Sequence, residues 1–102
     1  MKIKAKLKKG VVSVKAMAKH DMTTYNQAEK KTGDRENANF ITHISGTCNG
    51  ETVFDMSTSQ FLSKNPIFKF KFKGDSFKKG DKLVMTWTDR KGSTVTDEGK
   101  IK

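Results

Sequence analysis

The sequence contains very little cysteine and proline, with one residue of each type, Cys48 and Pro66. One cysteine excludes an internal disulfide framework and any zinc site built from several cysteines. No segment approaches the roughly 20 apolar residues that a membrane-spanning helix needs. Arginine is also scarce, with only Arg35 and Arg90, and arginine is the side chain best suited to bidentate recognition of phosphates and guanine edges. The composition therefore disfavours a dedicated reader of nucleic-acid sequence.

Positive charge is what the sequence has in excess, since 21 lysines and arginines against 11 aspartates and glutamates give a net charge of +10. A surface of this sign attracts nucleic acids, acidic proteins or small inorganic anions, and charge alone does not choose among them. The 102 residues are enough for one domain, residues 1–102, with a modest core. Because only 33% of the residues are apolar, we expect a thin core between two layers.

Apolar and polar residues alternate in seven short segments, which predicts strands that each bury one face. The segments are residues 3–7, 11–19, 40–48, 52–56, 67–73, 81–88 and 93–101. Asn49-Gly50 between two of them is a strong signal for a tight antiparallel hairpin. Seven such strands, with turn residues between them, favour a sandwich or a small barrel.

Residues 20–39 interrupt this pattern with a long polar stretch, in which Met22 and Tyr25 are the large apolar side chains. Residues 26–31 have a short helical character, but no apolar stripe would hold a helix against the core. The sequence therefore predicts a long loop here. Long loops in compact domains are commonly functional or disordered, so this one is a candidate interaction element.

No constellation of residues indicates catalysis or a cofactor, because no nucleophile elbow, carboxylate pair, P-loop or dinucleotide turn is present. His20 and His43 have no neighbours at metal-ligand spacing. We expect Cys48 to be an inert, partly buried thiol, and Asp89 and Asp97 to be turn and solvation residues.

The segment 67–73 places three aromatic residues on one face and three lysines on the other. Phe68, Phe70 and Phe72 fit either the core or a surface for a homodimer of the isolated chain. The lysines are typical of a solvated face, which also attracts anionic or acidic partners. Trp87, with Leu83 and Met85, is expected to pack in the core.

The order and spacing of several short pieces resemble the SoxZ family of sulfur-oxidation proteins over nearly the whole chain. These pieces are Lys9-Gly10-Val11-Val12, His20 with Met22, Phe40-Ile41, Asn49-Gly50, Ser63-Lys64-Asn65-Pro66, Phe70-Lys71-Phe72-Lys73, Gly80-Asp81, Trp87-Thr88-Asp89 and Gly92. The chain departs from the family at His20-Asp21-Met22, where SoxZ-like sequences usually have His-Pro-Met, and it lacks a proline shortly before Phe40.

The resemblance implies an all-β immunoglobulin-like sandwich of about seven antiparallel strands that acts as the non-catalytic subunit of a SoxYZ sulfur-carrier complex. It implies a heterodimer with a SoxY-like protein, whose Gly-rich tail bears a sulfur-carrying cysteine, and transient contacts with other Sox enzymes. It also implies a periplasmic location reached by co-export with SoxY, and residues 1–14 lack the continuous apolar run of a signal peptide. We expect no cofactor, no membrane contact and no nucleic acid, and we expect the partner to bind at His20, Met22, Tyr25 and Phe40.

The alternative from another class is a basic β-domain that binds single-stranded nucleic acid. Such proteins stack bases on aromatic side chains beside cations on the same surface. The strict alternation in residues 67–73 places the aromatics and the lysines on opposite faces, which weighs against this alternative.

Overall fold

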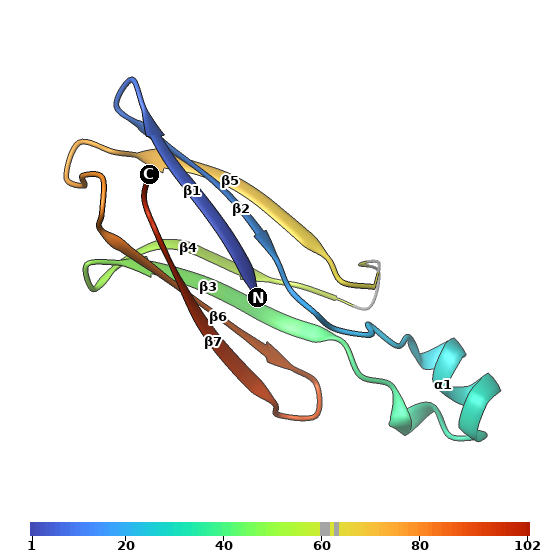
Figure 1. Ribbon diagram of the computed structural model, residues 1–102. Coiled ribbons are helices and arrows are strands. Elements are labelled where there is room, and N and C mark those ends of the chain that lie inside the picture. The colour runs from blue at the N-terminus through green and yellow to red at the C-terminus, as the bar shows by residue number, and fades with distance from the viewer. Residues whose placement is uncertain (60–61, 63) are drawn as a thin grey trace.

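The computed structural model describes residues 1–59, 62 and 64–102 as two antiparallel sheets packed face to face (Figure 1). The three-stranded sheet has the order β1-β2-β5, and the four-stranded sheet has the order β4-β3-β6-β7. The strands are β1 (Lys2–Lys8), β2 (Val11–Met17), β3 (Ile41–Cys48), β4 (Glu51–Ser57), β5 (Ile67–Lys73), β6 (Lys82–Asp89) and β7 (Thr94–Lys100). The predicted immunoglobulin-like sandwich of about seven antiparallel strands is confirmed.

Two hairpins are closed by pairs of residues with positive φ. Asn49 and Gly50 have φ of 52° and 80° between β3 and β4, and Lys9 and Gly10 have φ of 52° and 75° between β1 and β2. Positive φ at both central residues suits the right-handed twist of the paired strands. The sequence signal at Asn49-Gly50 is therefore confirmed.

The core lies between the inner faces of the two sheets, where alternate side chains of each strand meet. Leu83 and Met85 are fully buried on β6, and Trp87 is 6% exposed, so their predicted core position is confirmed. Phe68 on β5 is buried, whereas Phe70 and Phe72 are half-buried. The aromatic run of β5 thus passes from the core toward the side of the sandwich.

One side of the sandwich is closed by the C-terminal residues. Ala5 on β1 forms an isolated bridge with Ile101, Leu7 N donates to Lys102 O over 2.9 Å, and Lys102 N donates to Ala5 O over 3.0 Å. A side chain at Gly99 would meet Ile3 at 3.0 Å, so glycine permits β7 to approach β1 this closely. On the other side, no bridge joins β4 to β5 among the described residues.

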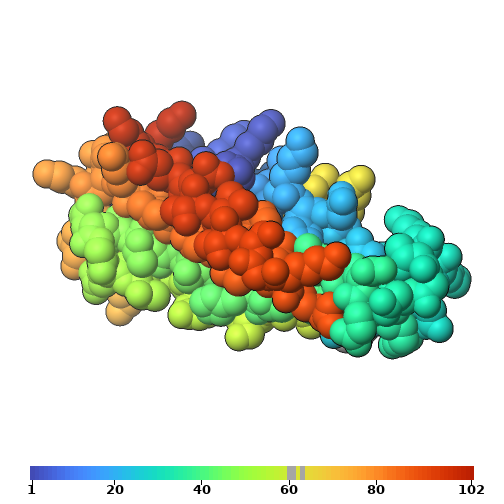
Figure 2. Space-filling view, turned by 90° about the horizontal axis from the view of Figure 1, so that it is seen from below, coloured from blue at the N-terminus to red at the C-terminus, as the bar shows by residue number. Residues whose placement is uncertain are grey.

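Residues 20–39 are not the helix-free loop that the sequence predicted. They contain α1 (Tyr25–Thr32) and a short 3-10 helix, η1 (Arg35–Asn37). We call residues 20–39 the cap, because they form a lobe at one end of the molecule (Figures 1 and 2). Among the described residues, no helix is long and apolar enough to cross a membrane.

The prediction of a loop failed because α1 is stabilised at its ends and not by an apolar stripe. Thr24 and Gln27 form a capping box, in which the Thr24 hydroxyl accepts from Gln27 N and the Gln27 side chain accepts from Thr24 N. Gly33 ends the helix in the left-handed conformation with φ of 79°, and its N–H donates to Glu29 O. These caps satisfy backbone groups that a short helix otherwise exposes. Ala28 is the buried residue of α1.

Candidate partner-binding surfaces

His20 joins the cap to the core of the sandwich through both ring nitrogens. Its Nδ1 accepts a hydrogen bond from Met22 N over 2.9 Å, and its Nε2 lies 3.1 Å from Asp89 Oδ2. Because Nδ1 accepts, the ring carries its proton on Nε2, which donates to the carboxylate. The ring also meets Trp87 edge-on, with centroids 5.1 Å apart. The His20 side chain is only 7% exposed, so its role in the free chain is structural.

Asp89, at the end of β6, is the buried acceptor of this junction, with 4% exposure. Besides His20, its carboxylate accepts from Asn39 Nδ2 and from Ser93 N, each over 2.9 Å. Burial raises the pKa of Asp89, but the hydrogen bonds from Asn39, His20 and Ser93 outweigh burial, so the pKa lies below its ordinary value. Asp89 opens a turn as expected, since Gly92 N donates to its carbonyl over 3.0 Å. The expectation that it is solvated is wrong, because its carboxylate is buried against the cap.

Arg90 fastens the outer part of the cap. Its guanidinium lies over the Tyr25 ring, 5.2 Å from the centroid, and its Nε donates to the Tyr25 hydroxyl over 3.1 Å. Its Nη1 donates to the carbonyls of Glu36 and Ala38, each over 3.0 Å, and its Nη2 donates to the Glu36 carboxylate over 2.5 Å. One planar side chain thus holds the start of α1 and the end of η1 together.

The four residues predicted to bind a partner all lie in or next to the cap, but most of their surface is turned inward. Met22 is 3% exposed and its sulfur accepts from Ile41 N over 3.3 Å, while Phe40 is 8% exposed. Tyr25 is half-buried and meets Phe40 edge-on, with centroids 5.7 Å apart. The structure thus gives Met22, Phe40 and His20 a supporting role, and their contact with a partner remains a prediction.

A second surface lies on the open side of the sandwich, between β4 and β5. Phe54 on β4 stacks on Phe70 of β5 with centroids 4.1 Å apart, Phe70 neighbours Phe72 at 6.2 Å, and Phe72 meets Phe77 at 5.4 Å. All four rings are half-buried, and we call them the aromatic seam. Phe70 and Phe72 were expected in the core or at a dimer surface. Phe54 and Phe77 were not expected here, because they have no aromatic neighbours in the sequence.

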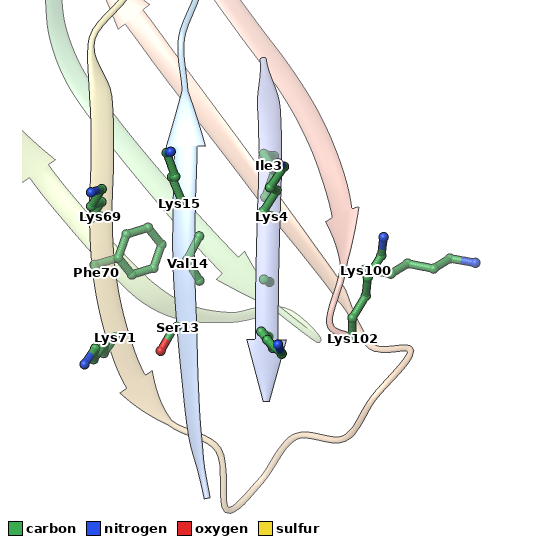
Figure 3. A pocket seen from close by; sticks show the side chains of 12 residues that line it. Ile3, Lys4, Ser13, Val14, Lys15, Lys69, Phe70, Lys71, Lys100 and Lys102 are labelled. Atoms are coloured by element: carbon green, nitrogen blue, oxygen red, sulfur yellow. The ribbon is translucent and has the colours of Figure 1, made fainter. Parts of the chain in front are cut away.

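The outer face of the three-stranded sheet carries a third surface, which we call the lysine face. Its eight lysines are all exposed and are Lys2, Lys4, Lys6, Lys8, Lys15, Lys69, Lys71 and Lys73. Lys69 and Lys71 on β5 flank β2 on one side and Lys4 on β1 flanks it on the other (Figure 3). A hollow of about 920 Å³ lies over this face.

Comparison with known proteins identifies a family and solved structures of similar fold. The family described as "Sulphur oxidation protein SoxZ" matches residues 1–100. The chain belongs to the SoxZ family. It is thus a subunit of a sulfur-oxidising Sox system, and the resemblance found in the sequence is confirmed.

A solved structure of superoxide reductase in the oxidised state superposes with a TM-score of 0.64 and 18% sequence identity, over 98% of this chain and 85% of that chain. At this identity the likeness concerns the fold alone. Comparison with curated protein sequences gives no match.

The single thiol of this SoxZ-family chain is out of reach of solvent. Cys48 is fully buried at the end of β3. Burial raises the pKa of its thiol, and the negative charges of Asp81 and Glu51 raise it further. Since the thiolate is the reactive form, this environment suppresses nucleophilic sulfur chemistry at Cys48.

His43 lies on the surface of the four-stranded sheet and not in the core. Its Nε2 lies 2.5 Å from Asp55 Oδ1 on the outer face of the four-stranded sheet, where the His43 side chain is 41% exposed. Among the described residues, no group of three or more histidine, cysteine, aspartate or glutamate side chains could hold a metal ion. The described histidines thus have structural partners.

Proposed function

We propose that this SoxZ-family chain is the non-catalytic subunit that binds a SoxY-like sulfur carrier and supports its cysteine-bearing tail while other Sox enzymes act on it. The observation that carries the proposal is the family match over residues 1–100. Pairing with SoxY and the carrier role come from the family's known biology. The burial of Cys48 supports a non-catalytic role for this chain. In this proposal the partner's cysteine carries the sulfur intermediates.

The aromatic seam is the surface that fits a lasting heterodimer best. Aromatic side chains are enriched in protein interfaces, and a few of them commonly contribute most of the binding free energy. The seam offers Phe54, Phe70, Phe72 and Phe77, each still partly exposed in the free chain. Burial of their remaining apolar area by a partner would stabilise the complex.

The edges of β4 and β5 strengthen this choice. Both are terminal strands of their sheets, and the edge of a sheet presents unpaired N–H and C=O groups that a partner strand can use. β1, at the other end of its sheet, is already covered in part by Ile101 and Lys102. A SoxY-like partner at the open side would therefore gain both apolar contacts and main-chain hydrogen bonds.

The cap is the second part of the proposed partner surface. His20, Met22 and Phe40 hold it on the sandwich from inside, and Tyr25 with Arg90 shapes its outer part. In the same proposal the folded pair reaches the periplasm by co-export with the SoxY-like subunit.

Co-expression with a candidate partner that ends in a Gly-rich, Cys-bearing tail tests this function. We expect the two chains to co-purify, and we expect hydrogen exchange in β4 and β5 to slow in the complex. Phe54→Ser should weaken co-purification, and Val95→Ser is the matched control, because Val95 is a half-buried apolar residue on β7, at the other end of the four-stranded sheet from β4. Slowing confined to residues 20–39 would move the interface to the cap, and failure of the wild-type chains to co-purify would refute the pairing.

A further inference from the structure

The lysine face is notable for the absence of opposite charge. β1, β2 and β5 contain eight lysines and no aspartate or glutamate. None of these lysines has an acidic partner within 4.0 Å in the part of the chain that the structure describes. The four-stranded sheet instead carries acidic residues with partners, such as Asp55 with His43 and Glu98 with Lys82. The strands of the three-stranded sheet therefore carry positive charge alone, whereas those of the four-stranded sheet carry both signs.

The strand register places like charges directly opposite one another. Lys15 on β2 pairs with Lys4 on one side and with Lys69 on the other. Like charges in directly opposite positions destabilise a sheet. Protection of exposed edges explains lysines on edge strands, but β2 is the central strand of its sheet. The free protein thus maintains a repulsive row at Lys15 that edge protection does not explain.

The spacing of the lysines matches an extended polypeptide. Alternate residues of a strand are about 7 Å apart, and β1 and β5 lie two strand spacings apart, or about 9.5 Å. Their lysines therefore form two walls beside a floor made by β2, whose outward residues include Ser13. A single extended segment fits between such walls, and its acidic residues at alternate positions would meet successive lysine rows.

Apolar side chains mark the two ends of this floor. Val11 is 38% exposed at the start of β2, and Ile67, which pairs with Met17 at the other end of β2, is 51% exposed. These are the exposed large hydrophobic residues among those described. They supply apolar contacts at the ends of a ligand that is acidic in the middle.

We propose that the lysine face binds an extended, acidic segment of a protein partner, with glutamate or aspartate at alternate positions between apolar ends. The proposal goes beyond the heterodimer argued above, because it uses the outer face of the sheet and not the aromatic seam. A single inorganic anion would gain little there, since exposed ion pairs are individually weak.

A nucleic acid would lack the stacking platform that single-strand binders use. The aromatic residues of β5 point to the opposite face, where Phe68 is buried and Phe70 stacks on Phe54. The observed face therefore favours an acidic peptide over a polynucleotide.

A residue-resolved NMR titration of the whole chain tests the proposal. The probe is a synthetic peptide of about seven residues in the order Val-Thr-Glu-Thr-Glu-Thr-Val. In an extended chain this order places the valines and the glutamates on the same face. We expect amide shifts on β1, β2 and β5. Binding should weaken as the ionic strength rises from about 0.01 M to about 0.15 M, because the Debye length then falls from about 30 Å to about 8 Å.

The variant Lys4→Gln/Lys15→Gln/Lys69→Gln removes one row of the face and should weaken binding about tenfold, the effect of three exposed ion pairs together. The matched control is Lys30→Gln/Lys31→Gln/Lys91→Gln, which changes the net charge equally at exposed positions outside the face and should leave binding nearly unchanged.

Equal weakening by the two triple variants would overturn the proposal, as would equal binding of a peptide with glutamine in place of glutamate. Shifts confined to other parts of the wild-type chain would overturn it without recourse to any variant. Tighter binding of an oligothymidylate at the same lysines would assign the face to nucleic acid instead.

Discussion

His20 and Asp89 are 69 positions apart in the sequence, and their side chains meet in a hydrogen bond of 3.1 Å where the cap joins the end of β6. The contact is buried, since the two side chains are 7% and 3% exposed. Asn39 donates to the same carboxylate oxygen. Both ends of the cap are thus tied to one carboxylate on the sandwich.

Asp89→Asn is expected to destabilise the protein by about 1 to 3 kcal/mol, because a buried hydrogen-bonded acceptor loses its charge and part of its accepting capacity. The folded-state pKa of Asp89 is lowered, so its contribution to stability is present above the ordinary aspartate pKa of about 3.9 and is lost as the pH falls through the folded value. Chemical denaturation between neutral pH and pH values below that range measures both effects.

Asp75→Asn is the control for this prediction, because Asp75 is exposed. The difference in unfolding free energy between the wild type and Asp89→Asn should shrink in acid. The unfolding free energy of Asp75→Asn should equal that of the wild type at every pH. A constant difference at every pH would show that the charge of Asp89 contributes nothing.

Arg90→Lys is expected to loosen the cap while leaving the sandwich folded. Lysine keeps the charge but cannot reproduce the planar contact with Tyr25 or the several N–H donors that reach Glu36 and Ala38. Amide exchange in α1 should accelerate, and exchange in β3 and β6 should not change. Lys91→Arg is the matched control, because it makes the reverse exchange at the neighbouring exposed position and should leave exchange in α1 unchanged.

The sequence was sufficient to predict the strands, because each strand's alternation is a local property that survives into the fold. The helix in the cap was missed although its signals, Thr24 with Gln27 and the later Gly33, are present in the sequence, because α1 lacks the apolar stripe that usually identifies a helix. Asp89 could not be recognised as buried, because its donors His20 and Asn39 come from distant positions. Met22 was expected at the surface for the same reason, since its neighbour Ile41 is known only from the fold.

The run of aromatic residues on β5 is expected to divide into two functional classes. Phe68 is 5% exposed, so Phe68→Ala should cost about 3 to 5 kcal/mol of folding free energy. Phe70 is half-buried in the aromatic seam, so Phe70→Ala should cost less in the free chain and should weaken the proposed heterodimer more. Thermal denaturation of each variant and co-purification with the partner separate the two effects. A Phe70→Ala chain as unstable as Phe68→Ala, with normal pairing, would place Phe70 in the core alone.

Lys15→Thr is expected to stabilise the free protein, in contrast to most substitutions. The change removes the central charge of the row in which Lys15 lies between Lys4 and Lys69, and relief of such opposed charges should be worth about 0.2 to 1 kcal/mol. Threonine also favours strands, so Lys6→Thr on β1 is the control, because Lys6 lies opposite Ser13 and not opposite another lysine. Thermal denaturation at low and high salt is the measurement. The gain at Lys15 should shrink as salt screens the repulsion, and a gain that is independent of salt and equal at Lys6 would be due to strand propensity alone.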